Sequence, residues 1–187
     1  NIAIGHESMK EISTGYNNIA IGRETLINTK GGYENTAIGY LTMKDNTSGL
    51  LNVAVGAYAA TGNTTGQENV AIGHSALQEN QEGDEIVAVG RYAAYNTNPT
   101  AGTGDSVVIG ASAGFTNTTG VQNTFVGHKA GYSNTTSSQH VFVGREAGYS
   151  HTEGTTNIFI GARSGYLNTS GANNTVVGHQ ALYNNVH

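Results

Sequence analysis

Several residue types that most globular proteins use are scarce or missing in this chain of 187 residues. It has no cysteine, which excludes a disulfide framework, a zinc ribbon and thiol catalysis. Only 11% of its residues are charged, proline occurs once and tryptophan is absent. No apolar run approaches the roughly 18 residues of a membrane-spanning helix, so we expect no membrane insertion. The formal net charge of −5, with scattered Lys and Arg, argues against nucleic acid as a partner.

Glycine is the residue in excess, and it occupies 27 of the 187 positions. It shows no three-residue period, and with a single proline this excludes a collagen triple helix. No segment shows sustained 3.6-residue periodicity, which argues against amphipathic helices. Ten Tyr and a low net charge argue against disorder. The composition therefore favours a protein of strands and turns.

A tetrapeptide of three mostly apolar residues followed by glycine recurs along the whole chain. We place its glycines at position 0 and call them the turn glycines. Their residue numbers rise in steps of 17, as from Gly5 to Gly22, except that the step from Gly90 to Gly110 is longer by three. Eleven copies at this spacing define an internal repeat. The turn glycines are Gly5, Gly22, Gly39, Gly56, Gly73, Gly90, Gly110, Gly127, Gly144, Gly161 and Gly178.

The three residues before each turn glycine have the pattern of a strand. Positions −3 and −1 carry Ile, Val or Thr and share one face because they are two residues apart. Position −2, on the other face, is Ala in the first six copies and Val or Phe in the last five. Both faces of the strand are thus mostly apolar, as expected of a strand that is covered on both sides. The glycine then ends the strand in a turn that needs positive φ or a close backbone approach.

A 17-residue repeat is too short for a helix pair or a propeller blade, and it suits one coil of a parallel β-solenoid. We predict an all-β fold, a parallel β-solenoid (β-roll) of eleven coils, which forms a single domain over residues 1–187. Several early copies have Leu or Met at position +4, whereas later copies have Gly there and an aromatic residue at position +5. We expect a second short strand or extended segment at these positions. Asn at positions −4 and +7 is expected to stack into ladders that satisfy backbone groups of the turns.

Burial of both strand faces bears on the oligomeric state. A 17-residue coil can hide one face inside itself, and the other face needs another chain or remains a long apolar stripe. The column of Phe125, Phe142 and Phe159 and the column of Tyr residues are among the side chains that need such cover. We therefore predict a homotrimer whose chains are intertwined around the rod axis, with a monomeric solenoid as the alternative.

The segments Asn35–Gly39, Asn52–Gly56 and Asn69–Gly73 resemble the N-S-V-A-I-G motif of trimeric autotransporter adhesin heads. They are also similar to the N-T-A-I-G-x-x-A-G and N-T-T-G repeats of bacteriophage tail fibres and other virion fibres. The 17-residue period and the Asn-Thr-x-Gly segment match the phage fibres better. The resemblance covers nearly the whole chain, and it implies a left-handed β-roll with three chains around one axis.

The same resemblance implies an extracellular, structural and adhesive segment of a virion fibre, which contributes to recognition of a host cell-surface glycan or protein receptor. A trimeric bacterial surface adhesin head is the alternative, and a secreted solenoid with an ice-binding or polysaccharide-degrading face is a further one. The chain begins and ends inside repeats, so we expect a fragment of a longer fibre. We expect no enzymatic activity and no cofactor.

The candidate surface-binding loop is Asn98, Pro99 and Thr100, within the three-residue insertion near residues 97–103. Insertions in repeat proteins map to loops, often on a binding face, and the alternative is a tolerated decoration. Residues Thr47, Thr64 and Thr118 belong to a Thr column at position +8 that raises the ice-binding interpretation, although Lys30 and Gln81 interrupt it.

Three further groups have both a functional and a plain structural interpretation. Histidines at position +1 suggest a metal or pH-sensitive site, but their copies are not consecutive, which favours solvated turn residues. Four acids suggest calcium, but they lack the spacing of a calcium loop, so we predict no metal site. A Tyr column suggests glycan stacking, although packing between chains explains it better. These residues are His6, His74, His128 and His179, Glu79, Glu82, Asp84 and Glu85, and Tyr132, Tyr149 and Tyr166.

Overall fold

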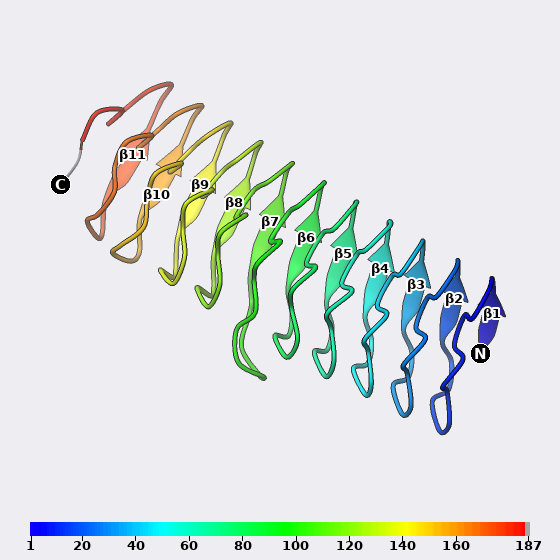
Figure 1. Cartoon of the computed structure of the whole chain (residues 1–187). Coiled ribbons are helices and arrows are strands. Elements are labelled where there is room, and N and C mark those ends of the chain that lie inside the picture. The colour runs from blue at the N-terminus through cyan, green and yellow to red at the C-terminus, as the bar shows by residue number, and fades with distance from the viewer. Residues whose placement is uncertain (186–187) are drawn as a thin grey trace.

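The computed structural model describes residues 1–185, and within this range the fold is all-β, without a helix. Eleven three-residue strands form one parallel sheet, and their order in the sheet is their order in the sequence (Figure 1). The strands are β1 (Ile2–Ile4), β2 (Ile19–Ile21), β3 (Thr36–Ile38), β4 (Val53–Val55), β5 (Val70–Ile72), β6 (Val87–Val89), β7 (Val107–Ile109), β8 (Thr124–Val126), β9 (Val141–Val143), β10 (Ile158–Ile160) and β11 (Thr175–Val177).

Each strand pairs with the strand one repeat further along the chain, in register. Ala54 of β4 lies opposite Ala71 of β5, and Phe142 of β9 lies opposite Phe159 of β10. The pair β6 and β7 keeps this register across the longer interval, because the three additional residues leave the sheet as a loop. The predicted solenoid of 17-residue coils is confirmed. We number the coils 1 to 11 and start each at position −4, so that coil 9 covers residues 140–156.

The coils stack in a row, with β1 and β11 at opposite ends (Figure 1). With neighbouring strands about 4.8 Å apart, the ten steps between eleven coils give a rod about 48 Å long. Every inner strand pairs on both sides with strands of its own chain. The sheet thus has no gap between its strands for a strand of another chain.

The half of the coil that follows the turn glycine contains turns instead of the expected second extended segment. Residues at positions +2 and +4 have positive φ values, such as +61° for Tyr58 and +52° for Leu77. The N–H group at position +4 donates to the carbonyl at position +3 of the next coil, and the Leu77 to Ala93 bond measures 3.0 Å. The ladder between coils therefore continues outside the sheet.

The core is a narrow column inside the coils, between position −2 and positions +3 and +4. In coil 5, Ala71 at position −2 faces the buried side chain of Leu77 at position +4. In coil 8, Phe125 at position −2 faces Gly131, where an added Cβ atom would lie 2.7 Å from the ring. In these coils a large residue at one of the two positions faces a small residue at the other, whereas coils 4 and 6 have Ala at both positions.

The Phe column lies inside its own chain. Phe125, Phe142 and Phe159 are fully buried, and their ring centroids are 5.3 and 4.8 Å apart in stacked pairs. The expectation that these rings need cover from another chain is therefore wrong, because the 17-residue coil closes around them. The face that stays uncovered is the other one, with positions −3 and −1.

The two predicted Asn ladders are confirmed and form the polar part of the core. At position −4, the Asn52 amide donates to Asn35 Oδ1 at 3.0 Å and to the Gly66 carbonyl at 2.9 Å. At position +7, the Asn63 amide donates to Asn46 Oδ1 at 3.0 Å. Because these groups are buried, the bonds keep turn carbonyls and amides from being left without partners.

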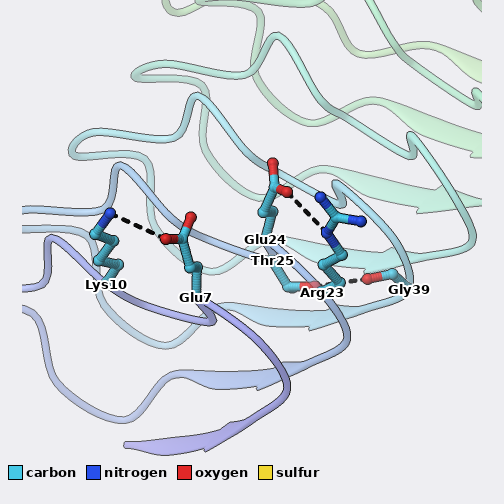
Figure 2. Close-up of polar contacts among 6 residues, drawn as sticks. All are labelled: Glu7, Lys10, Arg23, Glu24, Thr25 and Gly39. Carbon is cyan, nitrogen blue, oxygen red and sulfur yellow. Dashed lines mark hydrogen bonds and ion pairs between the residues drawn. The ribbon is translucent and has the colours of Figure 1, made fainter.

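Near the N-terminal end, side-chain contacts tie neighbouring coils at the turn glycine. Figure 2 shows the Thr25 hydroxyl donating to the carbonyl of Gly39 in the next coil at 2.6 Å. The ion pairs Glu7–Lys10 and Arg23–Glu24 in the same view lie on the rod surface. Exposed pairs of this kind add little stability.

Candidate functional surfaces

The outward-pointing side of the sheet, formed by positions −3 and −1, is a regular apolar surface along the whole rod. Val53, Ile72 and Ile160 are 38%, 39% and 39% exposed, although all three are large β-branched residues. We call this surface the outer apolar face. Contiguous apolar surfaces of this kind mark sites of interaction in soluble proteins. The single chain itself leaves the face uncovered.

Residues of opposite charge flank the outer apolar face. Position −5, just before the strand, carries acidic residues ahead of β3, β5, β6 and β7, and we call this column the acidic edge. Position +1, just after the turn glycine, carries Arg or His in seven coils, and we call it the basic edge. The acidic edge is Glu34, Glu68, Glu85 and Asp105, and the basic edge is His6, Arg23, His74, Arg91, His128, Arg145 and His179.

Like charges crowd one another on the acidic edge. The carboxylate of Asp105 raises the pKa of Glu85, both through its charge and through a hydrogen bond between the two side chains. The neighbouring charge of Glu68 acts in the same direction. A basic partner placed against this edge would relieve the repulsion.

The turn glycines line up along the rod next to the outer apolar face. Gly56 has a φ of +132°, and an added Cβ atom would lie 2.6 Å from the carbonyl oxygen of Gly73 in the next coil. A side chain at this position meets both a disfavoured backbone conformation and a direct clash. The glycine column thus sets how closely the coils approach and has no chemical role of its own.

The candidate surface-binding loop lies partly against the rod. Figure 1 shows the long loop between β6 and β7, but Pro99 in it is buried and its ring covers Gly83. Asn98 is tied down, since its side-chain oxygen accepts the Gln81 N–H at 2.9 Å. Of the three predicted residues, Thr100 alone is exposed.

Asp84, one of the four acids considered for calcium, fixes this loop. Its carboxylate accepts hydrogen bonds from the backbone N–H groups of Gln67 at 2.6 Å and Gly102 at 2.7 Å. Both carboxylate oxygens of Asp84 thus bind backbone groups. The other three acids, Glu79, Glu82 and Glu85, are exposed. Within residues 1–185, no three His, Asp or Glu side chains come together in a way that suits a metal ion. The four histidines of position +1 likewise stay on separate coils.

The aromatic column stacks within the chain, from coil to coil. Tyr132, Tyr149, Tyr166 and Tyr183 have centroid distances of 5.1, 5.1 and 5.0 Å, with nearly parallel rings. Neighbouring rings therefore cover one another's faces and leave their edges to solvent. Because a sugar stacks on an open ring face, this arrangement does not favour the glycan-stripe interpretation. Within one chain, the Tyr column therefore packs from coil to coil.

The Thr column at position +8 is also used internally. The hydroxyl of Thr47 donates to the Thr64 carbonyl at 3.0 Å, and the hydroxyl of Thr118 donates to the Thr135 carbonyl at 3.0 Å. Each of these hydroxyls is directed along the rod to the next coil. A flat array of outward hydroxyls, which an ice-binding face needs, is therefore not formed here.

Coil 9 contains a buried pair of histidines that the sequence analysis did not predict. His140 stands at position −4 and His151 at position +7, both of which are Asn in most coils. Both imidazoles are fully buried, and their centroids are 4.7 Å apart. The double interruption of the Asn columns in one repeat was the signal that could have revealed the pair.

Comparison of the chain with protein-family models, with curated proteins and with solved structures finds no match. Residues 1–185 contain no helix long and apolar enough to cross a membrane.

Proposed function

We propose that this chain is a stiff segment of an extracellular virion fibre, in which three copies lie side by side and contribute to attachment to a host surface. The observation that carries the proposal is the outer apolar face, which runs along all eleven strands and has edges of opposite charge. The repeat motif's resemblance to virion fibres supplies the setting.

The solenoid suits a structural role because its contacts repeat in every coil. Strand hydrogen bonds, two Asn ladders and stacked cores connect each coil to the next in the same register. A rod built in this way resists bending, and it offers few unpaired backbone groups to a protease. Such a rod holds a binding surface at a fixed distance from its point of attachment.

The charges favour parallel chains in a ring. In a cyclic arrangement, one edge of each copy meets the opposite edge of the next copy, because the interface is heterologous. The two edges face each other across the same strand in two places. Glu68 and His74 flank β5, and Glu85 and Arg91 flank β6. An antiparallel pair would lose this match.

Sedimentation equilibrium tests the assembly. We expect a mass of three chains for the natural sequence and of one chain for Ile72→Lys, because a lysine at an interface centre leaves a buried, unpaired charge. Ile72 is 39% exposed in the single chain, so the variant should keep its β-type circular dichroism. The matched control is Thr119→Lys, at an exposed turn position, which should remain a trimer.

A natural chain that sediments as a monomer at micromolar concentration would contradict the trimer. A trimer that binds neither a glycan array nor intact bacterial cells would contradict the adhesive part of the proposal and leave the spacer role.

A further inference from the structure

The two histidines of coil 9 sit at one level of the rod, where the two Asn ladders would otherwise continue. Their rings meet nearly perpendicularly, at 87°. His140 also stacks on Phe142 at 4.8 Å, and His151 presents its edge to Phe159 at 6.0 Å. Two imidazoles are thus enclosed by aromatic side chains in the interior of the coil.

The hydrogen bonds of the pair suit neutral rings. His140 Nδ1 accepts the backbone N–H of Asn157 at 3.2 Å. His151 Nε2 lies 3.2 Å from the Asn157 amide nitrogen, and His151 Nδ1 lies 3.0 Å from Asn168 Oδ1. In this arrangement the Asn157 N–H groups donate to one nitrogen of each ring. A proton added to either of these nitrogens would face a donor and break the bond.

No charged side chain compensates a positive charge on the pair, although the Gly154 backbone and a hydrogen bond to Asn168 favour the protonated rings and partly oppose the effect of burial. The side chains that contact the pair or share its hydrogen bonds are Phe142 in coil 9 and Phe159, Asn157 and Asn168 in coil 10, and none is charged. Two buried polar atoms at this level, His140 Nε2 and Asn134 Oδ1 of coil 8, lack a hydrogen-bond partner. The one titratable group that faces each imidazole is the other imidazole.

We propose that coil 9 is an acid-sensitive break point of the rod, where protonation of His140 and His151 opens the coil while distant coils stay stacked. Opening can remain local because each coil of a solenoid contacts only its neighbours. The device belongs to the single rod and does not depend on the proposed trimer. In a fibre it would let acidic surroundings loosen the rod at one defined place.

The direction of the pH effect follows from the burial of the rings. Burial lowers the pKa of His140 from 6.5 to about 4, and the nearby His151 adds to the shift. Burial lowers the pKa of His151 as well. Below pH 6.5 the opened coil therefore binds protons that the closed coil does not, and the closed coil loses stability as the pH falls toward 4. Protonation of His140 alone should raise the equilibrium constant for opening of coil 9 (the opening constant) about 20-fold between pH 7 and pH 5.

Hydrogen exchange measured by mass spectrometry, corrected for the intrinsic pH dependence of exchange, tests the proposal on the full chain. The opening constant of amides in residues 140–156 should rise at least tenfold from pH 7 to pH 5. That of coils 3 and 4 should change far less. The double variant His140→Asn/His151→Asn should lose the rise, since it gives coil 9 the Asn, Asn and Phe set of coils 8 and 10. His128→Asn, an exposed control, should keep it.

A rise of equal size in coils 3, 4 and 9 would overturn the proposal, and so would a rise that survives in the double variant. If the double variant folds poorly, the comparison of coil 9 with coils 3 and 4 in the natural chain still decides between the two outcomes.

Discussion

Coils 1, 2, 3 and 5 and coils 8 to 10 fill the same cross-section in opposite ways. The early coils have Ala at position −2, and in coils 1, 2, 3 and 5 a long Met or Leu reaches across from position +4. The later coils have Phe at position −2 and Gly at position +4. Strand register is the same in both regions. In these seven coils the large side chain can therefore come from either position without a change of register, and coils 4 and 6, with Ala at both positions, keep the same register as well.

The two solutions differ in backbone strain. Position +4 has positive φ throughout, at +52° for Leu77 and +59° for Gly131. Only glycine adopts this region without cost, and other residues lose roughly 1–2 kcal/mol there. The early coils therefore hold their longest core side chains on strained residues, whereas the later coils place glycine at the strained position.

Gly131→Leu should have the largest effect, because it puts the early arrangement into a coil that keeps its Phe. The new side chain meets the Phe125 ring, since even a Cβ atom would lie 2.7 Å from it. Overpacking and positive φ together should cost about 3–5 kcal/mol of unfolding free energy. Urea denaturation measures this loss. Adding Phe125→Ala should restore more than half of it, and a double variant no more stable than Gly131→Leu would refute exchange across the core.

Substitutions of Leu77 should show the strain directly. Leu77→Ala leaves a cavity in a buried site and should cost about 2–4 kcal/mol. Leu77→Gly removes one more carbon atom than Leu77→Ala but relieves the positive φ, so it should be no less stable than Leu77→Ala. The usual order of these two residues is reversed in this expectation. Equilibrium unfolding of both variants checks it, and a clear advantage for Ala would show that position +4 is not strained.

Arg163→Gln should have the smallest effect. Arg163 Nε donates to Glu146 Oε2 at 2.6 Å between coils 9 and 10, but the pair is only partly buried, so solvent still screens it. The bond to Arg163 lowers the pKa of Glu146, so any stabilisation is present above pH 4.5 and is lost as the pH falls through the lowered pKa. Urea midpoints of both proteins should nearly coincide at pH 7 and coincide at pH 2.5. A large difference at pH 7 would contradict a minor role.

The sequence predicted the coil, the register and the Asn ladders, because each depends on a residue type that recurs every 17 positions. The direction in which a side chain points is harder to predict when both strand faces are apolar. Phe125 and Val126 are adjacent and both apolar, and the pattern did not show that Phe125 lies inside the coil. Because of this ambiguity, the prediction that another chain must cover the Phe column was wrong.

The candidate sites were less predictable, because they depend on single departures from the repeat. The insertion suggested a surface-binding loop, yet Pro99 in it covers Gly83, and Asp84 binds the loop backbone. The substitutions that matter most chemically, His140 and His151, replace Asn at positions −4 and +7, which are not neighbours in the sequence. Only the closed coil brings them into contact.

Distances between spin labels test the central claim, that each 17-residue coil forms one step of a straight stack. The chain has no cysteine, so cysteine pairs can be introduced at Ser48 with Thr136 and at Ser48 with Ser170, all at position +9. Pulsed electron paramagnetic resonance, with labelled chains diluted in unlabelled ones, should give about 24 Å for five steps and about 34 Å for seven. Distances that do not grow in proportion to the number of coils would contradict the stack.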